Sequence, residues 1–215
     1  MHIPKTVVIT CAGIGSRLGL GHTKSLIEIS GRPIIHWQLD MLKEVEDVRI
    51  VVGFEADRLI EVVRQVRNDI LFIYNHDYFN TKTLASLYLG AQYGHDLVFS
   101  IDGDLLVHPD DMKRLLAMSE EFIGFTKKTS EEPVYVRLDD KEHVISFTRR
   151  SGEYEWLGPA CLRREHLAAH KKLHVYQHIA SFLPIRGVCV RAMDIDTMRD
   201  FSKAKLFLKN SVGRR

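Results

Sequence analysis

The sequence predicts an α/β fold with a mixed, mainly parallel sheet, and three observations carry this prediction. Short runs rich in Val and Ile alternate with segments whose apolar residues recur at helical spacing. This alternation is typical of a parallel sheet covered by helices. A glycine-rich segment directly follows the first of these runs. Beyond about Phe122 the pattern changes to short strands separated by polar turns, which indicates a small antiparallel extension.

The first 121 residues show the alternation most clearly. Buried strands are predicted where β-branched and aromatic residues form short continuous runs, at 7–10, 47–53, 69–75 and 97–101. Helices are predicted between them, where apolar residues recur every three or four positions, at 33–45, 56–66 and 84–93. Pro33 suits a first helical position, because an N–H group there would have no partner within the helix.

The remainder of the chain is expected to form shorter elements. Strands are predicted at 123–126, 134–138, 144–148 and 187–193. A helical pattern at 167–183 ends at Pro184 with a break near His174, and a last helix spans 198–208 with Thr197 as its cap. No repeat or low-complexity linker divides the chain, so residues 1–215 are expected to form one domain.

Composition limits the classes of function. The chain is 45% hydrophobic and 27% charged, which suits a globular protein, and its net charge of +2 favours neither nucleic acid nor a membrane surface as partner. No apolar run approaches the ~20 residues of a membrane span, and the N-terminal residues do not resemble a signal peptide. Cys11, Cys161 and Cys189 lack metal-binding spacing and are expected to be reduced core thiols of a cytoplasmic protein.

The stretch 7–29, VVITCAGIGSRLGLGHTKSLIEI, carries the strongest functional signal. Glycines that follow a buried strand let backbone N–H groups approach an anion closely, because no Cβ intervenes. Arg17 and Lys24 add positive charge to the same segment. We interpret it as a phosphate cradle, and an ordinary βα turn with scattered glycines is the alternative.

Two well-known phosphate-binding motifs do not fit this stretch. A P-loop requires glycine directly before its Lys-Ser pair, and here Thr23 precedes Lys24 and Ser25. A dinucleotide-binding fingerprint requires its third glycine at the position that Leu18 occupies. The segment therefore belongs to neither class.

A third pattern does fit. Residues 11–17 (CAGIGSR), 24–29 (KSLIEI) and 31–35 (GRPII) resemble the signature of nucleotidyltransferases, which join a nucleoside triphosphate to a phosphorylated small molecule. Thr23 stands where that family usually has proline. The resemblance implies a Rossmann-like three-layer nucleotidyltransferase fold. It also implies a nucleotide-binding part at about 1–121 and an acceptor-binding part at about 122–215.

Acidic pairs follow two of the predicted strands, Asp102 with Asp104 and Asp194 with Asp196. Both reactants of nucleotidyl transfer are anions, so catalysis depends on alignment and charge neutralisation, usually with Mg²⁺ held by carboxylates. The resemblance implies that Asp104 and Asp196 bind Mg²⁺, with Asp102 and Asp194 as neighbouring or substituting ligands. Turn and helix-cap chemistry is the alternative for such pairs.

The resemblance also implies roles for the remaining site residues. Arg17 and Lys24 would be catalytic and bind the triphosphate, and backbone groups of Ala12 and Gly13 would face the base. The implied nucleotide-binding set is Ala12, Gly13, Ile14, Gly15, Ser16, Arg17, Lys24, Ser86 and Asp102. No general base is required, because a substrate phosphate is already ionised near neutral pH.

Four further segments point to the nucleotide and the acceptor. Residues 75–78 (NHDY), 86–89 (SLYL), 100–104 (SIDGD) and 193–201 (MDIDTMRDF) resemble cytidylyltransferases that activate phosphocholine and related phospho-alcohols or phosphonates, which favours CTP. Lys82 and Thr83 stand where those enzymes often carry paired asparagines, and a lysine facing the acceptor would suit an anionic or phosphonate group. Trp156 could wall the acceptor pocket and hold a cationic head group, or it could pack at a sheet edge.

The function predicted on these grounds is an Mg²⁺-dependent cytidylyltransferase that joins CTP to a small phosphorylated alcohol, amine or phosphonate and releases pyrophosphate. Three alternatives stay open: a sugar-1-phosphate nucleotidyltransferase using UTP, GTP or dTTP, a catalytically silent nucleotide-sensing domain, and a glycosyltransferase that holds a metal with residues 102–104. The oligomeric state also stays open, since a sheet edge or residues 126–184 could carry a homodimer interface.

Overall fold

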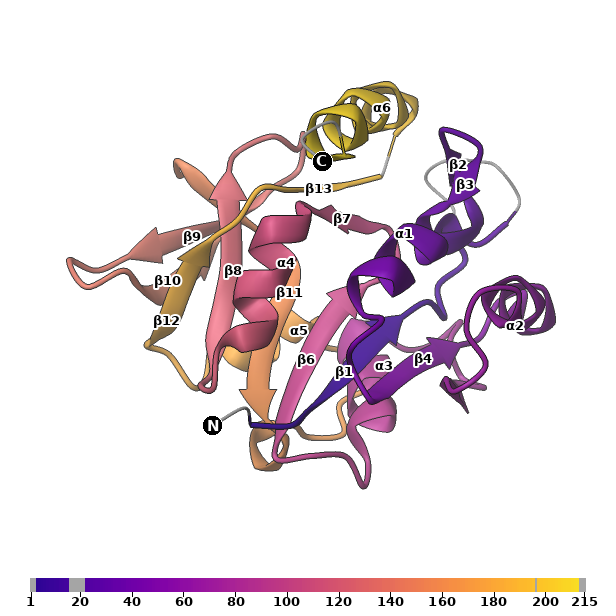
Figure 1. The fold of residues 1–215 in the computed structure, drawn as a ribbon. Coiled ribbons are helices and arrows are strands. Elements are labelled where there is room, and N and C mark those ends of the chain that lie inside the picture. The colour runs from indigo at the N-terminus through magenta and orange to yellow at the C-terminus, as the bar shows by residue number, and fades with distance from the viewer. Residues whose placement is uncertain (1–2, 16–21, 196, 213–215) are drawn as a thin grey trace.

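The computed structural model describes residues 3–15, 22–195 and 197–212. A nine-stranded sheet runs through these residues (Figure 1). In spatial order its strands are β5 (Leu71–Tyr74), β4 (Asp47–Val52), β1 (Lys5–Thr10), β6 (Leu97–Asp102), β11 (Tyr154–Arg163), β8 (Phe122–Lys127), β12 (Ile185–Cys189), β10 (His143–Thr148) and β9 (Val134–Leu138). The α-helices are α1 (Ile34–Met41), α2 (Ala56–Arg64), α3 (Thr83–Ala91), α4 (Pro109–Ala117), α5 (Val175–Ile179) and α6 (Met198–Val212). Shorter elements are the 3₁₀ turns η2 (Lys24–Leu26) and η3 (Arg164–His166) and the strand pairs β2 (Glu28–Ile29) with β3 (Arg32–Pro33) and β7 (Leu105–Val107) with β13 (Ala192–Asp194).

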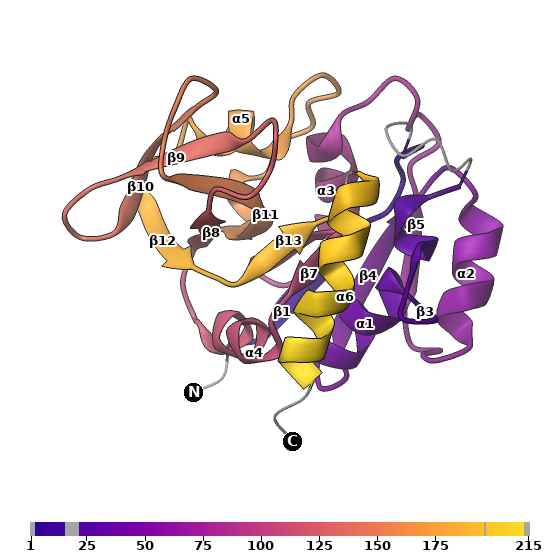
Figure 2. The same cartoon turned by 90° about the horizontal axis from the view of Figure 1, so that it is seen from above.

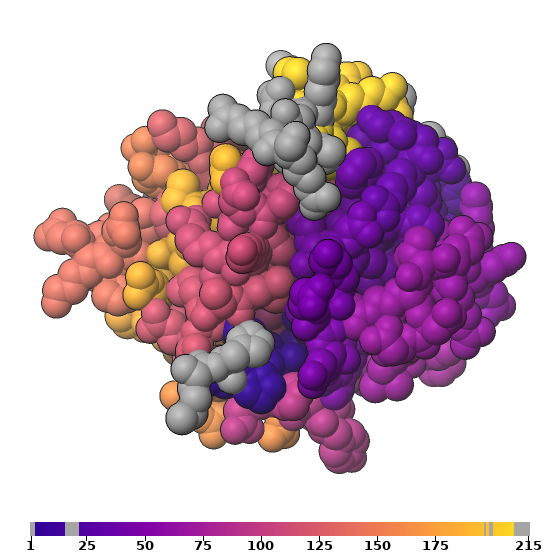
Figure 3. All heavy atoms as spheres, viewed as in Figure 1, coloured from indigo at the N-terminus to yellow at the C-terminus, as the bar shows by residue number. Residues whose placement is uncertain are grey.

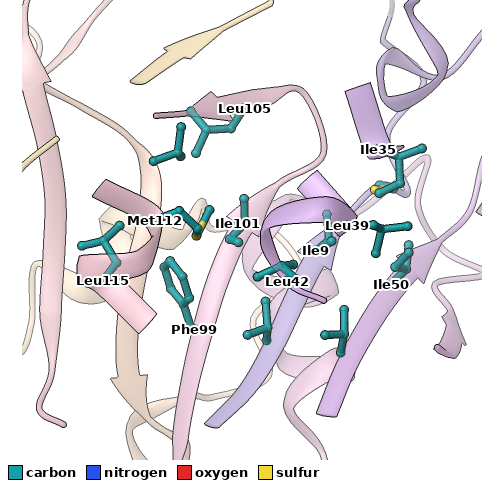
Figure 4. Packing of buried hydrophobic residues seen from close by; sticks show 14 of the residues in the cluster. Ile9, Ile35, Leu39, Leu42, Ile50, Phe99, Ile101, Leu105, Met112 and Leu115 are labelled. Carbon is teal, nitrogen blue, oxygen red and sulfur yellow. The ribbon is translucent and has the colours of Figure 1, made fainter. Parts of the chain in front are cut away.

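The first half of the sheet is parallel and is covered on both faces. Strands β5, β4, β1 and β6 pair in parallel register. Side chains alternate along β1, so that Val7 and Ile9 join the core cluster containing α1, α2 and α4, whereas Val8 joins the cluster containing α3. Figure 4 shows the first of these clusters, with the labelled residues Ile9, Ile35, Leu39, Leu42, Ile50, Phe99, Ile101, Leu105, Met112 and Leu115. Burial of both faces explains why these strands appear as continuous apolar runs.

The second half of the sheet closes on itself. Strands β11, β8, β12, β10 and β9 follow one another, and β9 pairs back onto β11. This closure is possible because β11 changes neighbours: residues 154–156 pair with β9 and β8, and residues 160–163 pair with β6. The change occurs at Gly158, whose φ is +114°, where the register between β11 and β8 shifts. A bulge at this glycine therefore joins the two halves.

The last segment returns to the first half of the molecule. Strand β13 pairs with β7, which places Asp194 opposite Leu105. Helix α6 lies over β13 and β7 (Figure 2), and in the space-filling view (Figure 3) its yellow atoms lie beside the purple segment that contains α1. The Asp200 N–H donates to Thr197 Oγ1 (3.3 Å), so Thr197 caps α6 as predicted.

The predicted α/β class and mixed sheet are confirmed, but several predicted elements are wrong. The sequence pattern did not predict β7, α4 or β11. The helical pattern predicted at 167–183 is wrong before its predicted break near His174, since only Val175–Ile179, which follows that break, is α-helical in this stretch. The strand predicted at 187–193 is two strands, because the chain leaves the main sheet after Cys189 and pairs with β7 instead.

The cysteines differ from the prediction in one case. Cys11 and Cys161 are buried, whereas Cys189 is exposed at the end of β12 and is not a core thiol. All three are unpaired. Among the described residues, no helix has both the length and the apolar composition needed to cross a membrane.

Candidate active site

A pocket of about 490 Å³ opens at the carboxyl ends of β1 and β6, where the two halves of the sheet meet. Ligands of open α/β sheets bind at this edge. The predicted site residues that line it are Ala12, Gly13, Gly15, Lys24, Lys82, Ser86, Asp102, Asp104 and Trp156. Among the predicted residues that the structure describes, Ile14 alone does not line the pocket, and Ser16, Arg17 and Asp196 lie outside the described residues.

The loop after β1 is held by the neighbouring strand. The Cys11 N–H donates to the Val51 carbonyl (2.9 Å), and the Phe54 N–H donates to the Ala12 carbonyl (3.1 Å). Among the described residues, no atom lies within 4 Å of the position that a Cβ of Gly13 would take. No described side chain therefore blocks the approach of a ligand to this stretch of backbone.

Lys24 begins η2 and contacts the end of β6. Its Nζ lies 2.6 Å from Asp104 Oδ2, and the two side chains are only 15% and 20% exposed. Gly15 has φ of +65°, and a Cβ at that position would lie 3.0 Å from Lys24 Cγ. The glycine thus leaves room for the lysine stem, and the ion pair joins the glycine loop to the acidic turn.

Thr23 fixes the position of Lys24 by a hydrogen bond that proline could not make. The buried Thr23 N–H donates to Glu55 Oε2 at 2.7 Å. Glu55 is the residue before α2 and has a left-handed backbone, with φ of 52°. Proline has no N–H to donate. Thr23, which stands where the family usually has proline, thus has an additional N–H group, and Glu55 accepts its hydrogen bond.

The turn between β6 and β7 is fixed on both sides. Asp102 Oδ1 accepts a hydrogen bond from Thr10 Oγ1 (2.7 Å), and the Gly103 N–H donates to the Thr10 carbonyl (3.0 Å). Gln38 Nε2 donates to the carbonyls of Asp102 and Leu105, each at 2.8 Å. These contacts hold the two carboxylates of the turn at the mouth of the pocket.

Asp194 adds a third carboxylate to the pocket wall. The Ile195 N–H donates to the Asp104 carbonyl (3.1 Å), which brings the end of β13 beside the acidic turn. Within the part of the chain that the structure describes, no three His, Cys, Asp or Glu side chains form a metal-sized cluster. Mg²⁺ commonly takes one or two protein carboxylates and completes its shell with phosphate and water, so the donor chemistry of these two segments fits Mg²⁺.

Cys11 also lines the pocket but is not a nucleophile there. Burial raises the pKa of its thiol to about 12, so the thiol stays protonated near neutral pH. The thiolate, not the thiol, is the reactive form of cysteine.

The far side of the pocket is built from α3, β11 and α5. Ser86 is buried and accepts a hydrogen bond from Asn75 Nδ2 (3.0 Å), and Trp156 packs against the ring of Tyr176. Arg149, His174 and Tyr176 also line this side, and the sequence did not predict them as site residues. No local signal marks them, because the closure of the sheet and the docking of α5 bring them to the pocket.

Comparison with known proteins identifies the family. Residues 7–184 match the family described as the MobA-like NTP transferase domain. A curated relative, the CMP-5'-(3-aminopropyl)phosphonate synthase of Streptomyces rubellomurinus, is 33% identical over 129 residues, which cover 55% of this chain and 20% of the relative. The bifunctional protein GlmU of Wolinella succinogenes is 21% identical over 159 residues, covering 71% of this chain and 37% of GlmU. The chain thus spans well under two thirds of the length of these two relatives.

Solved structures of low sequence identity share the fold. The CTP:phosphocholine cytidylyltransferase LicC of Streptococcus pneumoniae superposes with a TM-score of 0.80 at 17% identity, covering 96% of this chain and 100% of LicC. The inositol-1-phosphate CTP transferase of T. maritima gives 0.83 at 14% identity, covering 100% and 98%. The family match spans most of the chain, from within β1 to Pro184 after α5. This chain therefore belongs to the MobA-like NTP transferase domain family.

Proposed function

We propose that this enzyme is an Mg²⁺-dependent cytidylyltransferase, which transfers CMP from CTP to a small phosphorylated alcohol, amine or phosphonate and releases pyrophosphate. The observation that carries the proposal is the pairing of Lys24 with Asp104 at 2.6 Å, beside a glycine loop and two further carboxylates. The choice of CTP is supported by the names of the phosphonate synthase of Streptomyces rubellomurinus and of LicC, both of which refer to CMP or CTP.

The reaction needs charge neutralisation more than proton transfer. An oxygen of the acceptor phosphate attacks the α-phosphorus of the triphosphate, and the bond from that phosphorus to the bridging oxygen of the β-phosphate breaks. Lys24, together with Arg17, would neutralise the charge that develops on the equatorial oxygens. The backbone at Ala12 and Gly13 would receive the base, and Ser86 would belong to the same nucleotide site.

Carboxylates near Lys24 would hold the metal. Asp104 and Asp196 are the proposed ligands, with Asp102 and Asp194 as neighbouring or substituting ligands. A bound divalent cation supplies neutralisation of phosphate charge and orientation of the leaving pyrophosphate. Asp104 also has a role without the metal, because it orients the Lys24 ammonium across the pocket.

A second candidate is a sugar-1-phosphate nucleotidyltransferase. Its support is the similarity to GlmU and to a solved structure named UDP-glucose pyrophosphorylase, which gives a TM-score of 0.78 at 14% identity. The two candidates share the nucleotide half of the pocket and differ in the acceptor. Cytoplasmic location, a single domain and a homodimer remain predictions.

Pyrophosphate release tests the proposed function directly. The enzyme is incubated with Mg²⁺ and each of CTP, UTP, GTP and dTTP, against phosphocholine, phosphoethanolamine, 2-aminoethylphosphonate, 3-phosphonopropionate, glycerol phosphate, 3-phosphoglycerate and glucose 1-phosphate. We expect release with CTP and at least one phospho-alcohol or phosphonate, and none with chelator present. Release only with a sugar 1-phosphate would support the second candidate, and silence with every pair would overturn both.

Glu55 is expected to act as a positioning residue for Lys24. Replacing Glu55 with alanine removes the acceptor of the Thr23 N–H and should lower kcat/KM about tenfold, since hydrogen bonds to charged groups contribute roughly 1.5–3 kcal/mol. The effect should fall mainly on kcat, and Glu55→Gln should restore part of it. Glu61→Ala on α2 removes an exposed carboxylate and is the matched control. Unchanged kinetics of Glu55→Ala would refute this role.

A further inference from the structure

The two ends of the pocket differ in the charge of the side chains that line them. Its lining carboxylates among the described residues are Asp102, Asp104 and Asp194, all from β6, β13 and the turn after β6. The far side instead presents Lys82 and Arg149, which come from the start of α3 and the segment after β10. No described carboxylate lines that side. A cationic acceptor group would therefore find no counter-charge there.

The two far-side cations are not neutralised within the described part of the protein. Neither Lys82 nor Arg149 forms an ion pair with a described carboxylate. The guanidinium of Arg149 donates to the Glu132 carbonyl (3.1 Å) and lies over the ring of Tyr176, with 5.6 Å between Cζ and the ring centroid. A carbonyl and a ring hold the position of this charge but leave it positive. The remaining donors of Arg149 suit an anion.

Lys82 is positioned on the far side of the pocket because the start of α3 packs against the segment before α5. The Lys82 N–H donates to the Lys171 carbonyl (2.8 Å), and the Val175 N–H donates to Thr83 Oγ1 (3.2 Å). Thr83 Oγ1 also lies 3.5 Å from His174 Nδ1. The N-cap residue Lys82 makes no side-chain capping hydrogen bond to α3, and the dipole of this helix adds positive potential beside Lys82. Lys82, Thr83 and His174 thus form one polar wall.

The aromatic residues do not form a cage for a quaternary ammonium group. Tyr176 stacks with His174 at 6.1 Å between ring centroids and contacts Trp156 at 5.9 Å. Arg149 already uses the π-face of Tyr176, so an incoming cation would meet a like charge at that ring. The rings act as a rigid support for Arg149 and His174 instead.

We infer that the acceptor carries a second anionic group, a carboxylate or a further phosphoryl group, and that Lys82, Arg149 and His174 bind it. This inference rests on the proposed function, in which the acceptor's phosphate or phosphonate attacks the α-phosphorus of the triphosphate beside Lys24, at the other end of the pocket. The second anion takes no part in bond making: the acceptor phosphoryl oxygen still forms the new bond to the α-phosphorus, and pyrophosphate still leaves. Its role is to select and orient the acceptor.

Equilibrium binding of matched phosphonates tests the inference. The enzyme with CTP present and Mg²⁺ omitted is titrated calorimetrically with 3-phosphonopropionate, propylphosphonate and 2-aminoethylphosphonate. We expect 3-phosphonopropionate to bind about tenfold or more tightly than propylphosphonate, because charge-assisted hydrogen bonds are the strong ones. The amine should bind no better than propylphosphonate. A second pair, 3-phosphoglycerate against glycerol 3-phosphate, should show the same preference.

Variants locate the preference on named side chains. Lys82→Gln and Arg149→Gln should each reduce the preference for 3-phosphonopropionate about tenfold and leave propylphosphonate binding within about twofold of wild type. Arg150→Gln is the matched control, because Arg150 is exposed next to Arg149 but does not line the pocket. Unchanged melting temperatures would show that the variants fold.

Each contrary result has a distinct meaning. An equal loss for all phosphonates in Lys82→Gln and Arg149→Gln would show that these cations hold the reacting phosphoryl group, which overturns the inference. Tighter binding of the amine, or no preference in either matched pair, would overturn it as well. Preferential binding of 3-phosphonopropionate without pyrophosphate release from any NTP would instead count against the proposed function and leave the anion site standing.

Discussion

Replacing Lys24 with alanine is expected to lower kcat/KM for CTP by about 10²–10³-fold, the usual cost of removing a pre-positioned group that stabilises transition-state charge. The ammonium is held in place before substrate arrives, by Asp104 at 2.6 Å and by the close approach of Gly15 to its stem. Its stabilisation therefore needs little reorganisation during the reaction. The measurement is steady-state pyrophosphate release with saturating acceptor.

Two further variants make the Lys24 result specific. Lys113→Ala removes an exposed lysine of α4 and should leave kcat/KM unchanged. Lys24→Arg keeps the charge but not the compact geometry of an ammonium group and should recover only part of the activity. A Lys24→Ala enzyme with activity within tenfold of wild type would contradict the assignment of this lysine to the reacting phosphates.

The local pattern of apolar residues predicts those strands in which consecutive residues are all buried. The runs at 7–10, 47–53 and 97–101 lie in the parallel half of the sheet, which is covered on both faces, so each has a clear apolar signature. Strand β11 has no such signature, because it contains a buried Glu155 followed by Gly158 and Pro159. Glu155 is tolerated there because the N–H groups and hydroxyls of Thr129 and Ser130 donate to its carboxylate. Those partners lie 25 or more residues away in sequence, beyond the reach of a local pattern.

The candidate site also has one part that local sequence predicts and one part that depends on tertiary packing. The glycine loop, Lys24 and the turn at residues 102–104 follow strands, and the rule that ligands bind at carboxyl ends of parallel strands is enough to bring them together. Arg149, His174 and Tyr176 depend on the closure of β9 onto β11 and on the docking of α5 against α3. These contacts are set by tertiary packing, so the acceptor side of the pocket could be predicted from sequence only at Lys82 and Trp156.

Gly158 connects the two sides of the site, and its replacement by alanine is expected to damage both stability and activity. Its φ of +114° strains any residue with a Cβ, and that Cβ would lie 2.4 Å from Asp102 Oδ2. Backbone strain and overpacking each cost roughly 1–3 kcal/mol, so we expect the free energy of unfolding to fall by about 2–4 kcal/mol. Because Asp102 or the backbone beside Trp156 must move, kcat/KM should fall more than about tenfold.

Gly31 provides a control that separates strain from collision. It also has a positive φ (+76°), but a Cβ at Gly31 would meet no atom of the described residues within 4 Å. Gly31→Ala should therefore cost only about 1–2 kcal/mol of stability and leave kcat/KM unchanged. Chemical denaturation and pyrophosphate release measure the two quantities. Gly158→Ala could lose no more stability than Gly31→Ala and keep full activity. That result would show that the Asp102 carboxylate can leave its hydrogen bond with Thr10 Oγ1 without harm to the site. If Gly158→Ala loses activity beyond its loss of stability, the bulge in β11 is needed to align the acidic turn with the acceptor side of the pocket.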